Sequence, residues 1–358
     1  MSLFTINRRA ALLAFAAAVA LPMFAPGAAN AQEWPEVIRI GAVPSASGKA
    51  FATGLTGVAH VKEFVEAEFK DTPVKVEWVY LTGAGPAINE AFANKQVEFG
   101  QYGILPSLLG HSRGLPTKAV LAYGGVSTFA VVPKDSPVQS LKDLKGKRIG
   151  TMLTTMMHWA LLEALAQEGI APDEVTIVGL QGLDLLPAVT SGQVDAVFSA
   201  SELLTLEEQG LAKVVFSSRN GNPLTAGQGN YVADKDFIEQ YPEATQRVVN
   251  GLLKAGYWLA QPENREENFE IWAKSGVSPS ILAAELDGVD LKSLINPRLD
   301  EFYRGRVAAA VDFAQQEKLL RGDVNPEDFY DDRFYQKAIV ELGYENFWPD
   351  RTADGRVK

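Results

Sequence analysis

Two stretches of the sequence place hydroxyl side chains where a strand stops and a helix begins. Residues 147–165, KRIGTMLTTMMHWALLEAL, carry Thr154, Thr155 and His158 at such a junction, and residues 38–50, IRIGAVPSASGKA, run from the same Arg-Ile-Gly into serines and glycine. Helix N-termini present unpaired N–H groups and partial positive charge, and nearby Ser and Thr hydroxyls add donors. Such residues could hold a small oxyanion without formal cations, or they could simply cap the helix.

The elements around these junctions repeat. The motif RIG occurs at 39–41 and 148–150, and QVE at 96–98 matches QVD at 193–195. Strands are expected at 37–43, 74–81 and 96–103 and again at 147–153, 174–180 and 192–201, with helices near 55–69, up to 94, at 157–167 and at 185–190. Strand–helix alternation is typical of a parallel sheet with crossover helices. The duplication predicts an α/β fold of two similar lobes rather than a solenoid.

A shared cleft is expected where the two lobes face each other, because open α/β sheets bind ligands beyond the carboxyl ends of their strands. The loops at these ends are rich in hydroxyls, amides and glycines and nearly free of carboxylates. They span 45–49, 82–86, 101–104, 154–158, 181–183 and 199–202. The predicted ligand-binding residues are Ser45, Ser47, Gly48, Gly83, Gln101, Tyr102, Gly103, Thr154, Thr155, His158, Ser199, Ser201, Gln228 and Asn230.

Two of the titratable residues in these loops have alternative interpretations. His158 could contact the ligand or orient its loop, or it could hydrogen-bond the local backbone. Glu202 could pair with an amine of a zwitterionic ligand, or it could complement a helix N-terminus, which the sequence favours.

The N-terminus has the features of a cleaved export signal. Arg8 and Arg9 precede an apolar run over 10–24, and small residues lead to an A-x-A site at Ala31. Residues 1–31 are therefore predicted to be removed and the protein to be periplasmic. Adjacent arginines also mark twin-arginine export, but Ala11 stands where that signal usually has Phe, which favours the Sec route.

The rest of the chain is longer than a single core comfortably fills, which predicts two domains. Strands at 129–133 and 231–233 flank the second repeat and predict two chain crossings that form a hinge. The first lobe is then discontinuous, 35–128 plus 230–358, around a second lobe at 129–229. The remainder reads as helical, most clearly at 243–261, and its aromatic residues Tyr257, Trp258 and Trp272 are expected to be core.

Composition excludes several classes of protein. The formal net charge of −11 argues against nucleic acid as a partner. The sequence has no cysteine, which excludes disulfides, thiolate metal sites and cysteine nucleophiles. His60, His111 and His158 lack the spacing of metal ligands, and no nucleophile elbow, P-loop or dinucleotide motif follows a strand. We therefore expect neither a metal, nor a cofactor, nor enzymatic activity, and expect a monomer.

Longer motifs point to a known family. The order GPAINEAFANKQVEFGQYG, SLKDLKGKRIG, a histidine at the next helix start and SGQVDAVF, with LKDLKGKRIG at 141–150 and YDDRFYQKAI at 330–339, resembles the periplasmic binding proteins of ABC importers. Within these it is similar to the nitrate, taurine and aliphatic-sulfonate branch, over nearly the whole mature chain. The resemblance implies a type II-like clamshell with two parallel-rich sheets, flanking helices and a two-strand hinge. It also implies delivery of a small organic anion to an ABC permease driven by an ATPase.

The resemblance carries over to individual positions. Thr155 and His158 fall where sulfonate binders have a polar residue followed by His, and Gly103 falls at the matching glycine. Ile104 stands where these proteins often carry an acidic residue, and FSASE at 198–202 replaces a Trp-Asp stretch. These departures imply a roomier pocket for an apolar tail or ring beside an anionic or polar head. A pyrimidine or aromatic ligand, or a sensor role in place of import, is the alternative. A related enzymatic branch uses a cysteine motif that this chain lacks.

Overall fold

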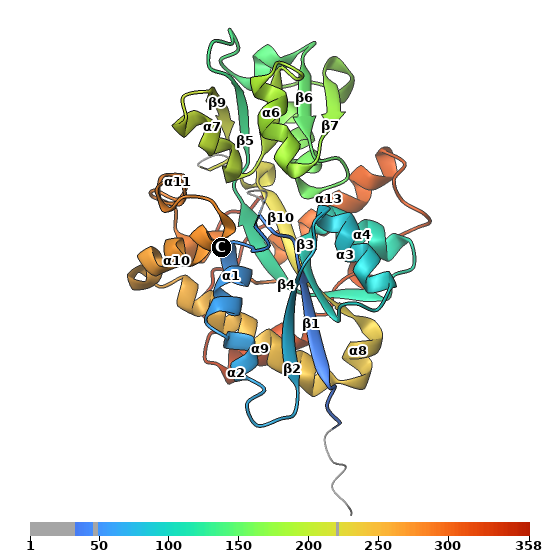
Figure 1. Ribbon diagram of the computed structural model, residues 1–358. Coiled ribbons are helices and arrows are strands. Elements are labelled where there is room, and N and C mark those ends of the chain that lie inside the picture. Colours follow the sequence, from blue (N-terminus) through green and yellow to red (C-terminus); the bar gives the residue numbers. More distant parts are fainter. Residues whose placement is uncertain (1–32, 46–48, 220–221) are drawn as a thin grey trace, which may run out of the picture. The chain divides into compact units, whose positions relative to one another are not determined.

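The computed structural model describes residues 33–45, 49–219 and 222–358, so the predicted export signal lies outside the described residues. Residues Trp34–Lys358 form one compact unit built on two five-stranded sheets (Figure 1). The first sheet has the order β2-β1-β3-β10-β4 and the second β7-β6-β8-β5-β9. The strands are β1 Val37–Ala42, β2 Lys75–Tyr80, β3 Phe99–Gly103, β4 Thr117–Val126, β5 Phe129–Pro133, β6 Arg148–Thr151, β7 Thr176–Gly179, β8 Ala196–Ser199, β9 Ala212–Ser217 and β10 Gly227–Asp234.

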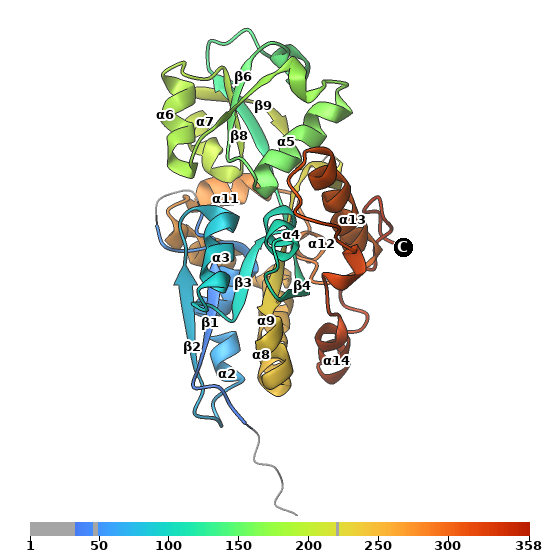
Figure 2. The same ribbon diagram turned by 90° about the vertical axis from the view of Figure 1, so that its right-hand side faces the viewer.

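Helices cover both faces of each sheet. They are α1 Gly54–Val61, α2 Phe64–Ala67, α3 Ala84–Ala93, α4 Ile104–Ser112, α5 Met156–Gln167, α6 Leu185–Thr190, α7 Leu204–Glu208, α8 Lys235–Gln240, α9 Pro242–Leu259, α10 Arg265–Trp272, α11 Pro279–Glu285, α12 Leu291–Leu294, α13 Glu301–Gln316 and α14 Arg333–Glu341. Helices α1 and α9 pack on one face of the first sheet and α3, α4 and α13 on the other. In the second sheet α5 and α6 lie on opposite faces (Figure 2). Within the described residues, no helix is both long and apolar enough to cross a membrane.

Both sheets are mixed, and their topology is the same. Strands β1, β2 and β3 are parallel, as are β6, β7 and β8. Each sheet then accepts one antiparallel strand, β10 in the first and β5 in the second. The yellow β10 in Figure 1 accordingly lies among blue and cyan strands from the start of the chain. The chain thus changes sheet twice, between Val126 and Phe129 and between Ser217 and Gly227, as expected for a hinge. The exact lobe boundaries stay a prediction.

The matched motifs of the two repeats make the same contact. The backbone N–H of Arg39 donates to the Glu98 carboxylate over 2.7 Å, and that of Arg148 donates to Asp195 over 2.8 Å. In each case the arginine side chain pairs with the same carboxylate. Both pairs join the first and third strands of a repeat, so the duplication predicted from the sequence is confirmed.

Two details of the secondary structure differ from the prediction. The helix expected over 55–69 breaks into α1 and α2, because Glu63 between them has a left-handed backbone with φ of 54°. The strands β4 and β9 were not predicted; they occupy one edge of each sheet.

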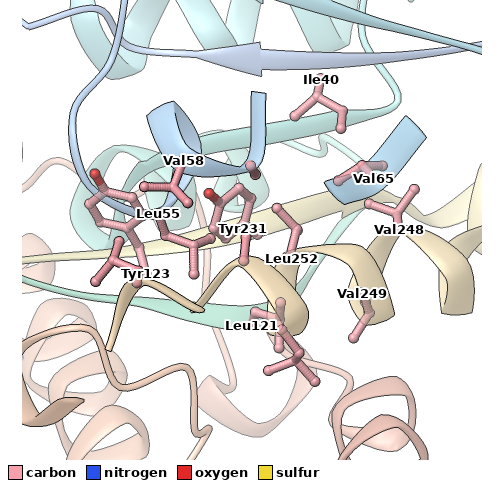
Figure 3. Close-up of a cluster of buried hydrophobic side chains, with 14 of the residues drawn as sticks. Ile40, Leu55, Val58, Val65, Leu121, Tyr123, Tyr231, Val248, Val249 and Leu252 are labelled. Atoms are coloured by element: carbon pink, nitrogen blue, oxygen red, sulfur yellow. The ribbon is translucent and has the colours of Figure 1, made fainter. Parts of the chain in front are cut away.

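The largest core lies between the first sheet and α9. The helix predicted at 243–261 is α9, which Pro242 begins and which presents Val248, Val249 and Leu252 to the sheet. Figure 3 shows these side chains beside Leu121 and Tyr231 of the sheet. Burial of each such side chain contributes about 1.5–3 kcal/mol, so this packing fixes the sheet whose loops are described next.

Candidate ligand site at the ends of both sheets

A cavity of about 600 Å³ lies where loops from both sheets meet. The first sheet supplies residues that follow β1 and β2, among them Ser45 and Thr82, and also Gln101 within β3. The second sheet supplies residues after β6, β7 and β8, among them Met152 and Gln181. The cavity therefore lies beyond the carboxyl ends of the parallel strands in both sheets, where the sequence predicted the cleft.

Helix starts form one wall of the cavity. Thr53 and Gly54 at the start of α1 line it, as do Gly83 and Ala84 at the start of α3. Among the described residues, no side chain caps either helix, so their first-turn N–H groups lack a side-chain acceptor. The Ser45 hydroxyl lies 3.5 Å from that of Thr53 on the same side. This wall offers hydrogen-bond donors and partial positive charge to an anion.

Much of the remaining wall is apolar. Met152 follows β6 of the second sheet, and Met156 and Met157 begin α5. Leu282, Leu286 and Trp272 come from the segment after α9. Trp272 is buried, as predicted, and its indole N–H donates to the Gly54 carbonyl over 2.9 Å. Its ring nevertheless lines the cavity as well as the core. The combination suits a ligand with an apolar body, because unbranched methionines adapt their shape to what they contact.

Two carboxyl groups also line the cavity. Glu202 follows β8 and Glu285 ends α11, and both are buried. Burial raises the pKa of Glu202, although the Ser199 hydroxyl donates to its carboxylate. Burial also raises the pKa of Glu285 to about 7, and the nearby charge of Glu202 adds to that effect.

Five of the predicted ligand-binding residues line this cavity: Ser45, Gly83, Gln101, Ser199 and Ser201. Ser47 and Gly48 lie outside the described residues. The remaining predicted residues are not part of the lining, although several of them are close to it in sequence. They are Tyr102, Gly103, Thr154, Thr155, His158, Gln228 and Asn230.

Tyr102 and Asn230 belong to a buried hydrogen-bond network. The Tyr102 hydroxyl donates to the Asn89 side chain over 2.9 Å, because alternation along β3 turns it away from the cavity that Gln101 faces. Asn230 accepts from Tyr303 over 3.0 Å and donates to the Tyr102 carbonyl. Their polar atoms are thus used within the protein.

Gly103 and Gln228 lie behind the cavity wall. A Cβ at Gly103 would come within 2.8 Å of the Met156 side chain, so this glycine permits close packing of α4 and α5. Gln228 is buried in β10 and donates weakly to the Pro223 carbonyl over 3.4 Å.

The polar residues before α5 act on their own helix. The Thr155 hydroxyl donates to the Met152 carbonyl over 2.7 Å and accepts from the Met157 N–H over 3.2 Å, which makes it the N-cap. Thr154 has a left-handed backbone, and its hydroxyl donates to the Leu153 carbonyl. Capping, the simpler of the two interpretations, is therefore what the structure shows for Thr155.

His158 packs on Phe313 of α13, with ring centroids 6.4 Å apart. Its Nδ1 is buried and has no hydrogen-bond partner among the described residues, and burial lowers the pKa of the ring. The histidine thus faces a helix from later in the chain and not the cavity. No cluster of three or more potential metal ligands occurs in the parts of the chain that the structure describes.

Thr155→Ala is expected to lower the free energy of unfolding by about 1 kcal/mol, because it removes the cap of α5. Ligand affinity should stay unchanged, since the hydroxyl does not line the cavity. Urea unfolding and calorimetric titration would measure the two quantities. A large loss of affinity at unchanged stability would return Thr155 to the binding site.

The sequence did not predict the contribution of residues after 270. Glu285 was missed because the sequence predicts that the helices after residue 270 pack on the first lobe only. A signal was present: Glu285 follows Ile281 and Leu282 by four and three positions, so it shares the apolar side of its helix. A carboxyl group on a core-facing stripe indicates a special environment.

Two α/β lobes with matching topology, and a cavity at the ends of their strands, define a bilobed ligand-binding protein of the periplasmic type. The chain belongs to the NMT1/THI5-like family, whose profile matches residues 59–265. It is similar to the periplasmic sulfonate-binding protein SsuA of Methylobacillus flagellatus, with 30% identity, a TM-score of 0.78 and coverage of 88% of this chain and 97% of that one.

Curated relatives agree with this likeness. An aliphatic sulfonates-binding protein of Escherichia coli is 26% identical over 85% of this chain and 94% of its own length. The taurine-binding periplasmic protein of Escherichia coli is 28% identical over 54% of this chain, and the match spans 63% of that protein, just under two thirds. Each of these three relatives is a binding protein by name.

Proposed function

We propose that this protein is a periplasmic solute-binding protein that captures a small, sulfonate-like organic anion and delivers it to an ABC permease powered by an ATPase. The observation that carries the proposal is the wall formed by the uncapped starts of α1 and α3, in a cavity that both sheets line. A sulfonate has three acceptor oxygens, which suit several N–H and hydroxyl donors at once. The roomy apolar remainder accommodates the organic part.

The binding mechanism follows from the origin of the lining. A ligand that contacts loops of both sheets gains all of its contacts only when the sheets are close together. This difference in contact free energy shifts the population towards the closed state. The permease can then distinguish loaded from empty protein by shape. Binding, not catalysis, is the proposed role.

Addition of a short alkanesulfonate such as 1-propanesulfonate is expected to raise the melting temperature of the purified mature protein. At a hundredfold excess over the dissociation constant, binding contributes about 2.7 kcal/mol to the free energy of unfolding. Thermal shift against a panel of sulfonates, nitrate and pyrimidines would measure this, with sodium chloride at equal ionic strength as the control. Mass spectrometry of small molecules released from fresh protein would identify any natural cargo. No response to any sulfonate would overturn the proposal.

Ser45→Ala removes a hydroxyl donor from the cavity wall at the starts of α1 and α3, so it is expected to weaken sulfonate binding. Loss of a hydrogen bond to a charged group weakens binding by about tenfold or more. Ser112→Ala is the matched control, since that hydroxyl donates to the Leu109 carbonyl outside the cavity and should leave affinity unchanged. Equal affinity in both variants would contradict the placement of the anion at this wall.

A further inference from the structure

The two carboxyl groups of the cavity come from different parts of the fold. Glu202 lies in the short turn Ser201–Leu203 after β8 of the second sheet. Glu285 ends α11, whose Ile281 and Leu282 belong to the core of the first sheet. Helix α11 nevertheless contacts α7 and the turn that carries Glu202. The carboxyl groups therefore approach each other from elements that pack on opposite sheets.

In the part of the chain that the structure describes, neither carboxyl group has a basic side chain paired with it. Glu202 and Glu285 are only 6% and 7% exposed, and within the described residues neither forms a salt bridge. The charge of Arg219 acts on Glu285, but the Arg219 guanidinium donates to the backbone carbonyls of Ala284 and Glu285. Two buried acids close enough to influence each other, with no salt bridge to either among the described residues, are unfavourable in a purely structural role.

The groups that do contact these acids are hydroxyls and one amide. Ser199 donates to Glu202, and the Ala200 N–H lies 3.3 Å from the same oxygen. The hydroxyls of Ser201 and Ser127 partly offset the effect of burial on the pKa of Glu285. These contacts orient the acids along the cavity wall but do not neutralise them. An unpaired acidic pair in a ligand cavity points to a ligand that carries the missing positive charge.

We propose that Glu202 and Glu285 form a cation subsite, which binds the protonated nitrogen of a zwitterionic ligand whose anionic end lies at the starts of α1 and α3. This inference rests on the proposed function and narrows the cargo to amino-substituted sulfonates or close analogues. A primary ammonium has three donors, enough for both carboxylates and a further acceptor. Because the acids belong to elements on opposite sheets, the nitrogen also links the two sheets when the ligand is bound.

The test compares two probes that differ only in the amine, 3-aminopropanesulfonate and 1-propanesulfonate, by calorimetric titration of the full mature protein at pH 8. The aminosulfonate is expected to bind at least about tenfold more tightly, as expected for a charge-assisted hydrogen bond. Glu285→Gln and Glu202→Gln should each abolish this preference, because each weakens binding of the aminosulfonate much more than binding of 1-propanesulfonate. Glu208→Gln is the matched control, because Glu208 accepts from Ser280 between α7 and α11 outside the cavity.

The preference should also depend on pH. From pH 5.5 to 8 the aminosulfonate should gain affinity as Glu285 ionises, whereas 1-propanesulfonate should not. The other charged groups that face this region are Glu202 and Arg219, with Lys49 and Asp184 elsewhere in the lining. Because these groups could also contribute to a pH effect, the Glu285→Gln variant is the control. The pH effect should be absent from that variant if it arises from Glu285.

The possible outcomes separate this inference from the proposed function. Equal affinity of the two probes for the native protein would overturn the cation subsite and leave a sulfonate-binding protein. An aminosulfonate preference that survives both Gln variants would also overturn it. Binding of propylamine without any sulfonate binding would support the subsite but refute the anion proposal. Failure of all three probes to bind would refute both.

Discussion

Glu285→Gln is expected to raise the free energy of unfolding of the ligand-free protein by about 3 kcal/mol at pH 8 and to leave it unchanged at pH 4. Burial first, and then the charge of Glu202, raise the pKa of Glu285 from its ordinary value of 4.5 to about 7. Below pH 4.5 the carboxyl is protonated in both folded and unfolded states. Between 4.5 and 7 the unfolded chain releases its proton first, so native stability falls as pH rises. Above 7 the loss is complete.

The replacement removes this loss because glutamine stays neutral at every pH and has nearly the same size. Urea unfolding at several pH values between 4 and 8 would give the difference between native and variant proteins. Glu208→Gln should show no such pH-dependent gain, since Glu208 is exposed. A variant that is destabilised equally at all pH values would mean that Glu285 acts as a structural hydrogen-bonding group. The subsite would then lose its main support.

Gly124→Ala is expected to destabilise the protein by about 3 kcal/mol or more, because two unfavourable effects coincide. Gly124 lies in β4 with φ of +97°, a backbone conformation that residues with a Cβ rarely adopt. A Cβ there would also lie 2.4 Å from the Leu294 carbonyl oxygen and 2.9 Å from the Ile295 Cα. Backbone atoms cannot move aside as a flexible side chain can. Leu294 and Ile295 line the cavity, so surviving protein should also bind ligand more weakly.

Gly114→Ala provides the matched control for this experiment. Gly114 has nearly the same φ, +91°, but no atom of the described residues lies within 4 Å of the position a Cβ would take. Its substitution should cost only the conformational part, about 1–2 kcal/mol. Thermal or urea unfolding of both variants would separate strain from steric overlap. Equal losses at the two glycines would show that the loop at Leu294 yields without cost.

Local signals in the sequence were sufficient to predict much of the fold. The matched RIG and QVE or QVD motifs identified the first and third strands of each repeat. The Arg39–Glu98 and Arg148–Asp195 pairs join these strands, and they depend on residues that both repeats share. The helical spacing of apolar residues over 243–261 predicted α9 equally clearly. The edge strands β4 and β9 were missed, since each pairs with a single antiparallel neighbour that enters from a chain crossing. No short sequence pattern indicates which strand such an edge strand will pair with.

The candidate site, like the fold, could be predicted from the sequence only in part. Ser45, Gly83, Gln101, Ser199 and Ser201 could be placed from the sequence, because residues after parallel strands gather at one edge of a sheet whatever the rest of the chain does. Alternation within a strand decided that Gln101 and not Tyr102 faces the cavity. Capping geometry decided that Thr155 serves its own helix.

The sequence by itself thus determined the two-unit α/β architecture, the chain crossings and the edge of each sheet that receives a ligand, because periodicity and repeated motifs act within a few residues. Only the tertiary structure placed Glu285 beside Glu202, more than eighty positions apart in the chain. That juxtaposition depends on how α11 packs between the sheets, and packing is set by shape across the whole molecule.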